Sequence, residues 1–591
     1  MPEPTTLLPP VRPVARPVVA KRGEPAPEEA TSPPVEDGAG RGRSRTRKVV
    51  VRGVWSVVGL LVLSLVWVGA RGALAVQSLV GAAPAMQDVA SALSEGPTPT
   101  VLASVSEVRG AVGRARGLLD DPVWRLYEHV PGVGGRMASV RATVEAADVL
   151  ADDALPRVVD LAGTLTFGPF DDPDDGYAML VRASEHDTDL AAIAGAVQQA
   201  HARLDGVGTD LVVPELTRYL ESALGTLDAA ADVAAVASPS VHALLEVAGG
   251  SGPTSTAVVF LDDTAAKPLG GRVERVLVLT AEHGAVREVR PVDPGTVLAA
   301  ATASAAYTTA AAGPQAALVA AGAPDVARLT STADASAALQ AGVAAATGTA
   351  PAAVVLVTAA GMDDLLGASA EPVPAAPSFV ATLAGLPPEG RAGAIDATVE
   401  TVVRGALTFQ GRADLVAFAL RDAVTDGGLR VWFADPAVQG ALAGSRGAGG
   451  LPADPVGGTP VVVSLDAGTG PAGVVADGLV VAQGTCGRLW AERPGVRLTV
   501  RTAPGVDGGS AARLLVQVPA RTDVAEVAVD GTVRPAGDAL TVDDHGLLVV
   551  DLAAGTSTVE VSLRGRADDG HGVQVVSRGG MPAAVTGSFS C

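Results

Sequence analysis

Three segments in the middle of the chain are the most informative about its architecture: AVVFL at 257–261, RVERVLVLT at 272–280 and VREVRPV at 286–292. The first is a short apolar run typical of a buried strand, and the other two flank the turn signal His283-Gly284. We therefore expect a strand followed by a β-hairpin. Ala-rich helical stretches come next, and strands that alternate with helices favour an α/β layer domain over 251–480.

The last hundred residues alternate apolar and polar side chains, for example over 496–501 and 559–564. Asp530-Gly531, which lies between two such runs, is a strong hairpin signal because both residues tolerate a positive φ. This pattern predicts an antiparallel β-sandwich over 481–591.

Upstream of the α/β domain, apolar residues recur with the period of a helix. Valines recur at spacings of four, three and four from Val101 to Val112, and a second stripe runs from Met137 to Ala151. Both stripes are typical of one face of an amphipathic helix. We expect an extracytoplasmic helical bundle or stalk over 71–250.

The charge is unevenly distributed along the chain. The whole chain carries a net charge of −21 from 43 Lys and Arg against 64 Asp and Glu, which argues against broad binding to nucleic acid. Its basic residues nevertheless gather between Arg41 and Arg52. Residues 1–40 show no helical or strand period, and we expect a disordered, basic, cytoplasmic tail over 1–53.

An uncharged run of 18 residues, Gly53 to Ala70, follows this tail. As a helix it would span ~27 Å, close to the ~30 Å hydrocarbon thickness of a bilayer. Trp55 and Trp67 lie near its two ends, where aromatic rings favour the headgroup level. We expect a transmembrane helix over 54–70 that contacts the lipid bilayer, with the N-terminus cytoplasmic and the C-terminus extracytoplasmic. The fold class is then α+β multidomain, with this helix, the helical bundle, the α/β domain and the sandwich in order.

A secretory signal is one alternative interpretation of the same segment, and a buried helix of a soluble protein is the other. Ala73-Leu74-Ala75 has the small residues of a cleavage site, so the chain could be cut after Ala75. The 53-residue arm and the length of the apolar run favour a retained anchor instead.

The chain has two cysteines, Cys486 and Cys591, and they flank the predicted sandwich. An extracytoplasmic location would expose both to oxidising conditions. We therefore predict a disulfide that closes the sandwich, and two free thiols are the alternative.

Sequence motifs of enzymes are incomplete. Residues 468–473 match a dinucleotide fingerprint, but the sequence after them does not predict the helix that such a site requires. Residues 443–447 approximate a nucleophile elbow without the preceding strand. The acidic run at 171–176 would need a carboxylate at its twelfth position as a calcium loop, and Arg182 stands there. We assign no catalytic, cofactor-binding or metal-binding residue, and we expect no cofactor.

Several motifs resemble a family of uncharacterised actinobacterial envelope proteins. They include DPVW at 121–124, VPGVG at 130–134 and TCG at 485–487, and the resemblance covers most of 54–591. In that family the strand near 260 leads into an Asn, Ala, Glu, Arg signature, whereas this chain reads LDDTAAKPLGG at 261–271. The family is a domain of unknown function, so the resemblance implies architecture and a single-pass envelope location.

The α/β region also resembles the LytR–CpsA–Psr family, which transfers glycopolymers from polyprenyl carriers onto peptidoglycan. The shared features are a hairpin over 276–289 and a strand followed by GMDDLLG at 361–367. That family has a Pro-Arg-Asp signature after the hairpin, where this chain has RPVDP at 290–294, and it places arginines on the lipid pyrophosphate. A solvated hairpin face is the alternative role for charged residues here. By this resemblance, four residues are candidate ligands of an anionic head group: Arg272, Arg275, Arg287 and Arg290.

Two functions follow from these patterns. We expect a single-pass cell-envelope protein whose ectodomain binds or scaffolds surface glycopolymer machinery without catalysis. The alternative is a glycopolymer phosphotransferase that uses a polyprenyl-pyrophosphate-linked donor. The expected partners are the bilayer, through 54–70, and an envelope glycopolymer or polyprenyl lipid. The enzyme would need several arginines and an aspartate to converge within 251–480.

Overall fold

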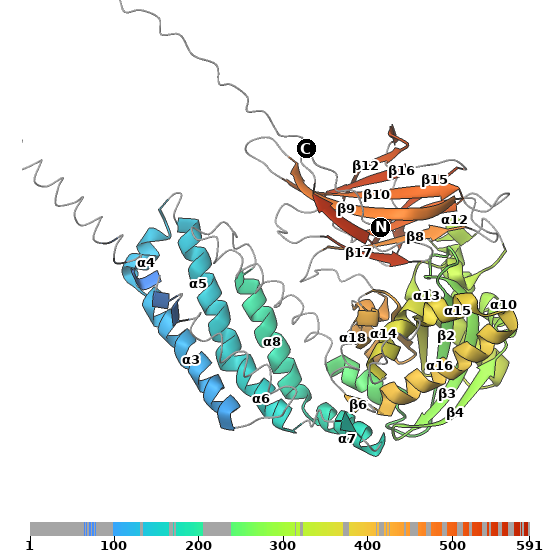
Figure 1. Ribbon diagram of the computed structural model, residues 1–591, viewed down its shortest axis with the longest axis horizontal. Coiled ribbons are helices and arrows are strands. Elements are labelled where there is room, and N and C mark those ends of the chain that lie inside the picture. Colours follow the sequence, from blue (N-terminus) through green and yellow to red (C-terminus); the bar gives the residue numbers. More distant parts are fainter. Residues whose placement is uncertain are drawn as a thin grey trace, which may run out of the picture. The chain divides into compact units, whose positions relative to one another are not determined.

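The computed structural model describes residues 99–204 and 238–588, with gaps in both ranges, and a few residues between 64 and 78. The tail expected over 1–53 lies outside the described residues. The described chain forms a group of helices, a central mixed sheet covered by helices, and a two-sheet β-sandwich (Figure 1). The range Trp67–Cys591 forms one compact unit.

The prediction of a transmembrane helix over 54–70 is wrong for the part of the chain that the structure describes. No helix found there is long and apolar enough to cross a membrane. Most of 54–70 lies outside the described residues. At its end, Trp67 contacts the protein: Asp121 accepts a 3.4 Å hydrogen bond from Nε1 of Trp67 and pairs with Arg71 at 2.7 Å.

The first helices form a bundle in which α5 contacts both α3 and α8. The valine stripe predicted from the sequence faces its interior, because Val105, Val108 and Val112 are buried. Asp121 caps the short helix α4 by accepting a hydrogen bond from the backbone N–H of Val123. The bounds are α3 (Pro99–Leu119), α4 (Pro122–Tyr127), α5 (Gly134–Val149), a π-helical turn (Leu150–Ala154), α6 (Leu155–Thr164) and α8 (Asp187–Leu204).

Part of the region expected to be a bundle, 71–250, packs against the central sheet instead. Tyr177, in α7 (Pro173–Glu185), lies against one of the sheet's apolar cores and meets the ring of His283 edge-on, with 6.1 Å between ring centroids. Val247 packs against the same core. The strand pair β1 (Pro169–Phe170) and β6 (Gly411–Arg412) adds a further link.

The central sheet has the strand order β4-β3-β2-β5-β7. Strands β2 and β5 are parallel, with Val258 opposite Val355, and the other neighbours are antiparallel. The predicted hairpin is present, and its turn places His283 and Gly284 at φ of 50° and 81°. The bounds are β2 (Thr254–Asp262), β3 (Arg272–Glu282), β4 (Ala285–Val292), β5 (Ala353–Thr358) and β7 (Leu429–Phe433).

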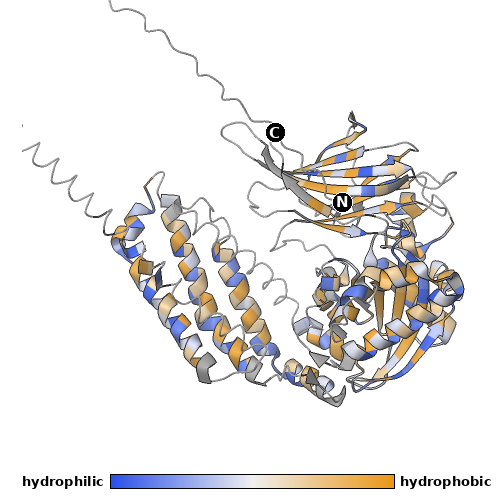
Figure 2. Ribbon diagram, in the orientation of Figure 1, coloured by the Kyte–Doolittle hydropathy of each residue, from blue (hydrophilic) through white to orange (hydrophobic). Residues whose placement is uncertain are grey.

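Helices cover both faces of this sheet, which explains why β2 reads as a continuous apolar run. Ala257 and Val259 point into one core and Val258 and Phe260 into the other. Figure 2 shows the hydrophobic colouring of the central strands. On the first face lie α10 (Pro294–Thr302), α11 (Ala305–Ala312) and α13 (Thr332–Thr347). On the second lie α14 (Ala359–Ser369), α15 (Phe379–Gly385) and α16 (Pro388–Thr408).

The sandwich packs the sheet β13-β12-β16-β10-β9-β18 against the sheet β14-β15-β11-β8-β17. The first sheet contains β9 (Val474–Cys486), β10 (Arg493–Pro504), β12 (Asp523–Val529), β13 (Thr532–Arg534), β16 (Thr558–Arg564) and β18 (Ala584–Ser588). The second contains β8 (Thr459–Asp466), β11 (Ala512–Val518), β14 (Leu540–Val542), β15 (His545–Leu552) and β17 (Val573–Arg578).

The sandwich differs from the prediction in two respects. It begins at β8 rather than at residue 481, because residues 459–486 supply one strand to each of its sheets. It is also not purely antiparallel, since β17 pairs with β8 and β18 with β9 in parallel. Alternation of side chains fixes which face of a strand is buried, but not the direction of its neighbour.

Candidate functional site

The site lies where the parallel strands β2 and β5 end, which is the edge at which open α/β sheets bind ligands. β7 starts beside this edge, and the backbone N–H of Thr358 donates to the carbonyl of Gly428 at 2.9 Å. Gly361, in the first turn of α14, approaches Gly428 so closely that a Cβ on either residue would collide with the other's backbone. On the side of α14, the backbone is therefore tightly packed against this edge of the sheet.

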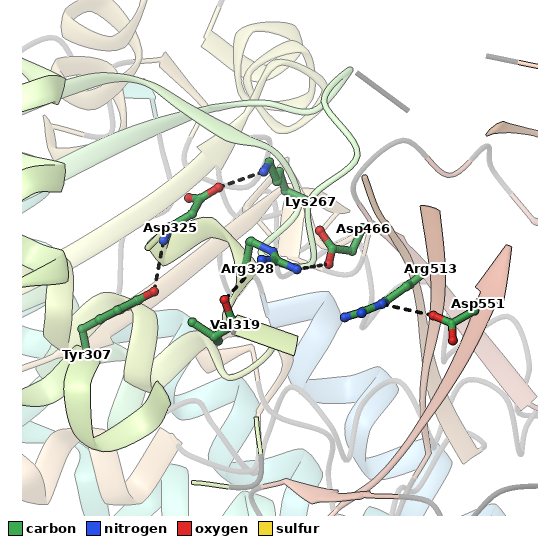
Figure 3. Close-up of polar contacts among 8 residues, drawn as sticks. All are labelled: Lys267, Tyr307, Val319, Asp325, Arg328, Asp466, Arg513 and Asp551. Atoms are coloured by element: carbon green, nitrogen blue, oxygen red, sulfur yellow. Dashed lines mark hydrogen bonds and ion pairs between the residues drawn. The ribbon is translucent and has the colours of Figure 1, made fainter. Parts of the chain in front are cut away.

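The loop 263–271 is tied to the segment around Asp325 and to helix α14. Its Lys267 pairs with Asp325 at 2.8 Å, and the backbone N–H of Asp325 donates to the hydroxyl of Tyr307 at 3.0 Å (Figure 3). Burial raises the pKa of that tyrosine above its ordinary value. Asp263, at the start of the loop, accepts a long hydrogen bond of 3.4 Å from the backbone N–H of Ala360. These contacts hold the loop in place.

A buried ion pair joins the sheet domain to the sandwich. Arg328 ends the short 3-10 helix Val326–Arg328, and Asp466 ends β8; their side chains are 2.9 Å apart and each is 1% exposed (Figure 3). Arg328 also donates to the carbonyl of Val319 at 3.3 Å. Beside the pair, Leu318 packs with Leu515 and Leu547 of the sandwich. The two domains therefore share a desolvated contact.

Arg430 is a second buried guanidinium at this junction, and it lies on β7 opposite Leu356. Its side chain is 0% exposed, and its Nη2 donates to the carbonyl of Leu269 at 2.5 Å. Its Nε and Nη1 have no hydrogen-bond partner among the described residues. Burial, together with the positive charge of Arg578, holds the pKa of Arg430 well below its ordinary value.

Arg578 is the third buried guanidinium, and it ends β17 opposite Ser464 of β8. It is 7% exposed, and no described residue accepts a hydrogen bond from its Nε. Burial lowers its pKa to about 10, so it is positively charged at neutral pH. A Cβ on Gly427, just before β7, would lie 3.9 Å from this Nε, which locates Arg578 beside the start of β7.

The four arginines predicted to bind an anionic head group lie on the hairpin, but three of them form ion pairs with carboxylates of the protein. Arg272 pairs with Asp262 at 3.1 Å, and Arg287 pairs with Glu282 at 3.3 Å. Arg275 makes a two-pronged contact with Asp396 of α16, and its Nε is 2.9 Å from Oδ1. The fourth, Arg290, is exposed on β4. No contact brings the four together among the described residues.

The predicted disulfide stays a prediction, because Cys591 lies outside the described residues and Cys486 is described only as the last residue of β9. Within the described parts of the chain, no three His, Cys, Asp or Glu side chains are grouped as ligands of a metal ion.

Sequence reasoning missed both Arg430 and Arg578. For Arg430 a signal was available, because it stands inside the apolar strand LRVWF at 429–433. Charged residues are almost never fully buried without a partner, so a charged residue in a buried strand points to a special role. Comparison of the chain with protein-family models, with curated protein sequences and with solved structures finds no match.

Proposed function

We propose that this chain is a non-catalytic protein of the cell envelope that binds or scaffolds the machinery of surface glycopolymers. The envelope setting is supported by the resemblance carried by the motifs at 121–124 and 130–134. The non-catalytic character is supported by the ion pairs that hairpin arginines form with carboxylates of the protein. The binding role is supported by the contact between the central-sheet domain and the β-sandwich.

The observation that carries the proposal is that three of the four hairpin arginines pair with carboxylates of the protein. A transferase acting on a lipid-linked donor needs guanidinium groups whose hydrogen-bond donors meet a pyrophosphate. Here Arg275 directs two donors at Asp396, and Arg391 of the same helix binds Glu274 of the hairpin with two donors at 3.0 Å. These reciprocal ion pairs fasten α16 to β3. They favour a structural role for the hairpin.

The contact between the sheet domain and the sandwich supports binding. Domains in one chain move relative to each other unless their interface is large and apolar. Here the Arg328–Asp466 pair is accompanied by the Leu318, Leu515 and Leu547 cluster and by a 3.0 Å hydrogen bond from Ala467 to Ala266. Such a joined pair of domains suits a fixed surface for a polymer or a partner protein.

Native mass spectrometry tests this proposal. The full chain, produced in an oxidising compartment, is incubated with a polyprenyl-pyrophosphate-linked oligosaccharide and a peptidoglycan fragment. We expect a non-covalent adduct of the glycopolymer and no transfer product. Transfer of the oligosaccharide to the peptidoglycan fragment would contradict the proposal in favour of a phosphotransferase, and the absence of any adduct would also contradict it.

A variant separates the structural from the ligand-binding role of the hairpin. Arg275→Gln removes the ion pair with Asp396, so we expect it to lower the thermal stability and leave the amount of retained glycopolymer unchanged. A loss of glycopolymer without a loss of stability would instead assign Arg275 to ligand binding.

A further inference from the structure

We propose that one end of the helical bundle contacts the headgroup level of a lipid bilayer through an exposed apolar patch. This surface, the α4-end patch, consists of four side chains: Trp67, Leu74, Leu126 and Val130. The contact lies at the membrane surface and requires no helix that crosses the membrane. The proposal goes beyond the proposed function, because it concerns how the chain is held at a membrane, whichever ligand it binds.

The first argument is where the exposed apolar side chains gather. Eight large apolar side chains are exposed among the described residues, and half of them belong to the α4-end patch. The others stand singly on separate elements: Leu102 of α3, Val380 of α15, Val533 of β13 and Val585 of β18. Single exposed apolar residues are normal on a folded domain, whereas a group of them marks an interaction surface.

The second argument is that two separate segments meet at this end of the bundle. α4 connects α3 to α5, which contact each other, so it lies at one end of this helix pair (Figure 1). Trp67 donates to Asp121, which caps α4, and Arg71 donates to the carbonyl of Leu118 at 3.2 Å, in the last turn of α3. Leu126 follows Asp121 by five residues, which is about 7.5 Å along a helix.

The third argument is that both segments are fastened to the bundle by other side chains. In α4, Trp124 and Tyr127 belong to a buried core, whereas Leu126 is 69% exposed. Ala75 belongs to the same core, whereas its neighbour Leu74 is exposed. Packing of the bundle therefore uses one side of each segment and leaves the apolar side chains of the other side to a partner.

The sequence before the patch indicates that this partner is lipid. Every residue from Gly53 to Val66 is uncharged, and this segment leads directly into Trp67. Whatever covers the patch must therefore also accept an uncharged apolar segment beside it. The boundary between headgroups and acyl chains accepts both, because it needs no shaped groove to bury apolar surface.

The polar groups of the patch suit the same level of a bilayer. The ring of Trp67 is 52% exposed, its N–H donates to Asp121, and the guanidinium of Arg71 lies 5.0 Å from the ring centroid. A tryptophan with one apolar and one hydrogen-bonded end favours the interface between lipid and water. The charges beside it form pairs, Arg71 with Asp121 and Arg125 with Asp120, so the contact does not desolvate an isolated charge.

The test is hydrogen–deuterium exchange of the full chain, measured by mass spectrometry with and without vesicles of phosphatidylglycerol and phosphatidylcholine. We expect the vesicles to slow the exchange of residues 122–130 at least about threefold, because a lipid contact opposes local opening of this segment. Residues around Leu102, at the opposite end of α3, should exchange at the same rate in both samples.

Two variants assign the effect to the patch. Leu126→Gln changes an exposed side chain, so we expect the chain to fold and the vesicles no longer to slow the exchange of 122–130. Leu102→Gln is the matched control, because this leucine is 58% exposed on the same bundle, and the slowing at 122–130 should persist.

Unchanged exchange over 122–130 in the wild type overturns the proposal even if the chain sediments with the vesicles, because another segment would then make the contact. Equal slowing in Leu126→Gln and in the wild type also overturns it. Slowing that appears without vesicles and grows with protein concentration would assign the patch to a second copy of the chain and overturn the lipid contact. The experiment contains no glycopolymer, so its outcome is independent of the test of the proposed function.

Discussion

At the scale of single residues, the ion pair between Arg328 and Asp466 makes the sharpest energetic prediction. Both side chains are desolvated, so removing one charge leaves the other buried without compensation. We expect Asp466→Asn to lower the free energy of unfolding by about 3 to 5 kcal/mol, as measured by urea denaturation.

The sandwich supplies a matched control for this substitution. Arg513 and Asp551 form an ion pair at 3.2 Å in which the aspartate side chain is 83% exposed (Figure 3). Exposed pairs contribute about 0 to 1 kcal/mol, so Asp551→Asn should cost far less than Asp466→Asn. Equal losses in the two variants would show that the buried pair does not stabilise the junction.

The carboxyl of Asp263 predicts a pH effect. Burial raises its pKa above the ordinary value, and the charge of Asp262 adds to the rise, against hydrogen bonds from Ala360 and Thr358. The folded chain therefore holds this proton more tightly than the unfolded chain, and stability falls as the pH rises from the ordinary Asp pKa to the raised one.

Replacing this carboxyl with an amide removes the effect. We expect Asp263→Asn to have a higher melting temperature than the wild type at about pH 7, and the gap to narrow as the pH falls below the ordinary Asp pKa. Melting curves of both proteins over this range are the measurement. A gap that is independent of pH would contradict the assignment to ionisation.

At the scale of elements, the junction of α14 with β7 depends on two glycines. A Cβ at Gly361 would collide with the carbonyl of Gly428, whereas Gly367, in the same helix, has nothing within 4 Å of its Cβ position. We expect Gly361→Ala to lower the free energy of unfolding by about 1 to 3 kcal/mol through overpacking. Gly367→Ala should raise it by about 0.5 to 1 kcal/mol through helix propensity. Chemical denaturation of the pair tests both signs, and a neutral Gly361→Ala would refute the close approach.

Helices, strands and turns could be predicted from the sequence where neighbouring residues in the chain determine them. The turns at His283-Gly284 and Asp530-Gly531 are present with the positive φ values that their residues favour, and the strands around 257–261 and 272–280 follow from their composition. Local patterns do not indicate which sheet a strand joins, and this explains why the range predicted for the α/β domain, 251–480, includes β8. The same limit hid the buried arginines, because Arg430 and Arg578 come from different sheets.

At the scale of the whole molecule, the register of the last strand bears on the predicted disulfide. β18 runs parallel to β9, with Ser588 opposite Gln483. Cys486 lies three positions after Gln483, at the end of β9, and Cys591 lies outside the described residues. The last described strand therefore ends beside the strand that carries Cys486, which favours the predicted disulfide.

We expect this bond to form when the chain is made under oxidising conditions, and to stabilise it by up to about 4 to 5 kcal/mol, because it closes a loop of about a hundred residues in the unfolded state. The measurement is alkylation in denaturant followed by intact mass. Without a reductant, neither cysteine should take up the reagent, and after reduction both should. Cys486→Ser should lower the melting temperature of the oxidised protein to that of the reduced wild type. Uptake of two alkyl groups without a reductant would show that the sandwich is not closed by a disulfide.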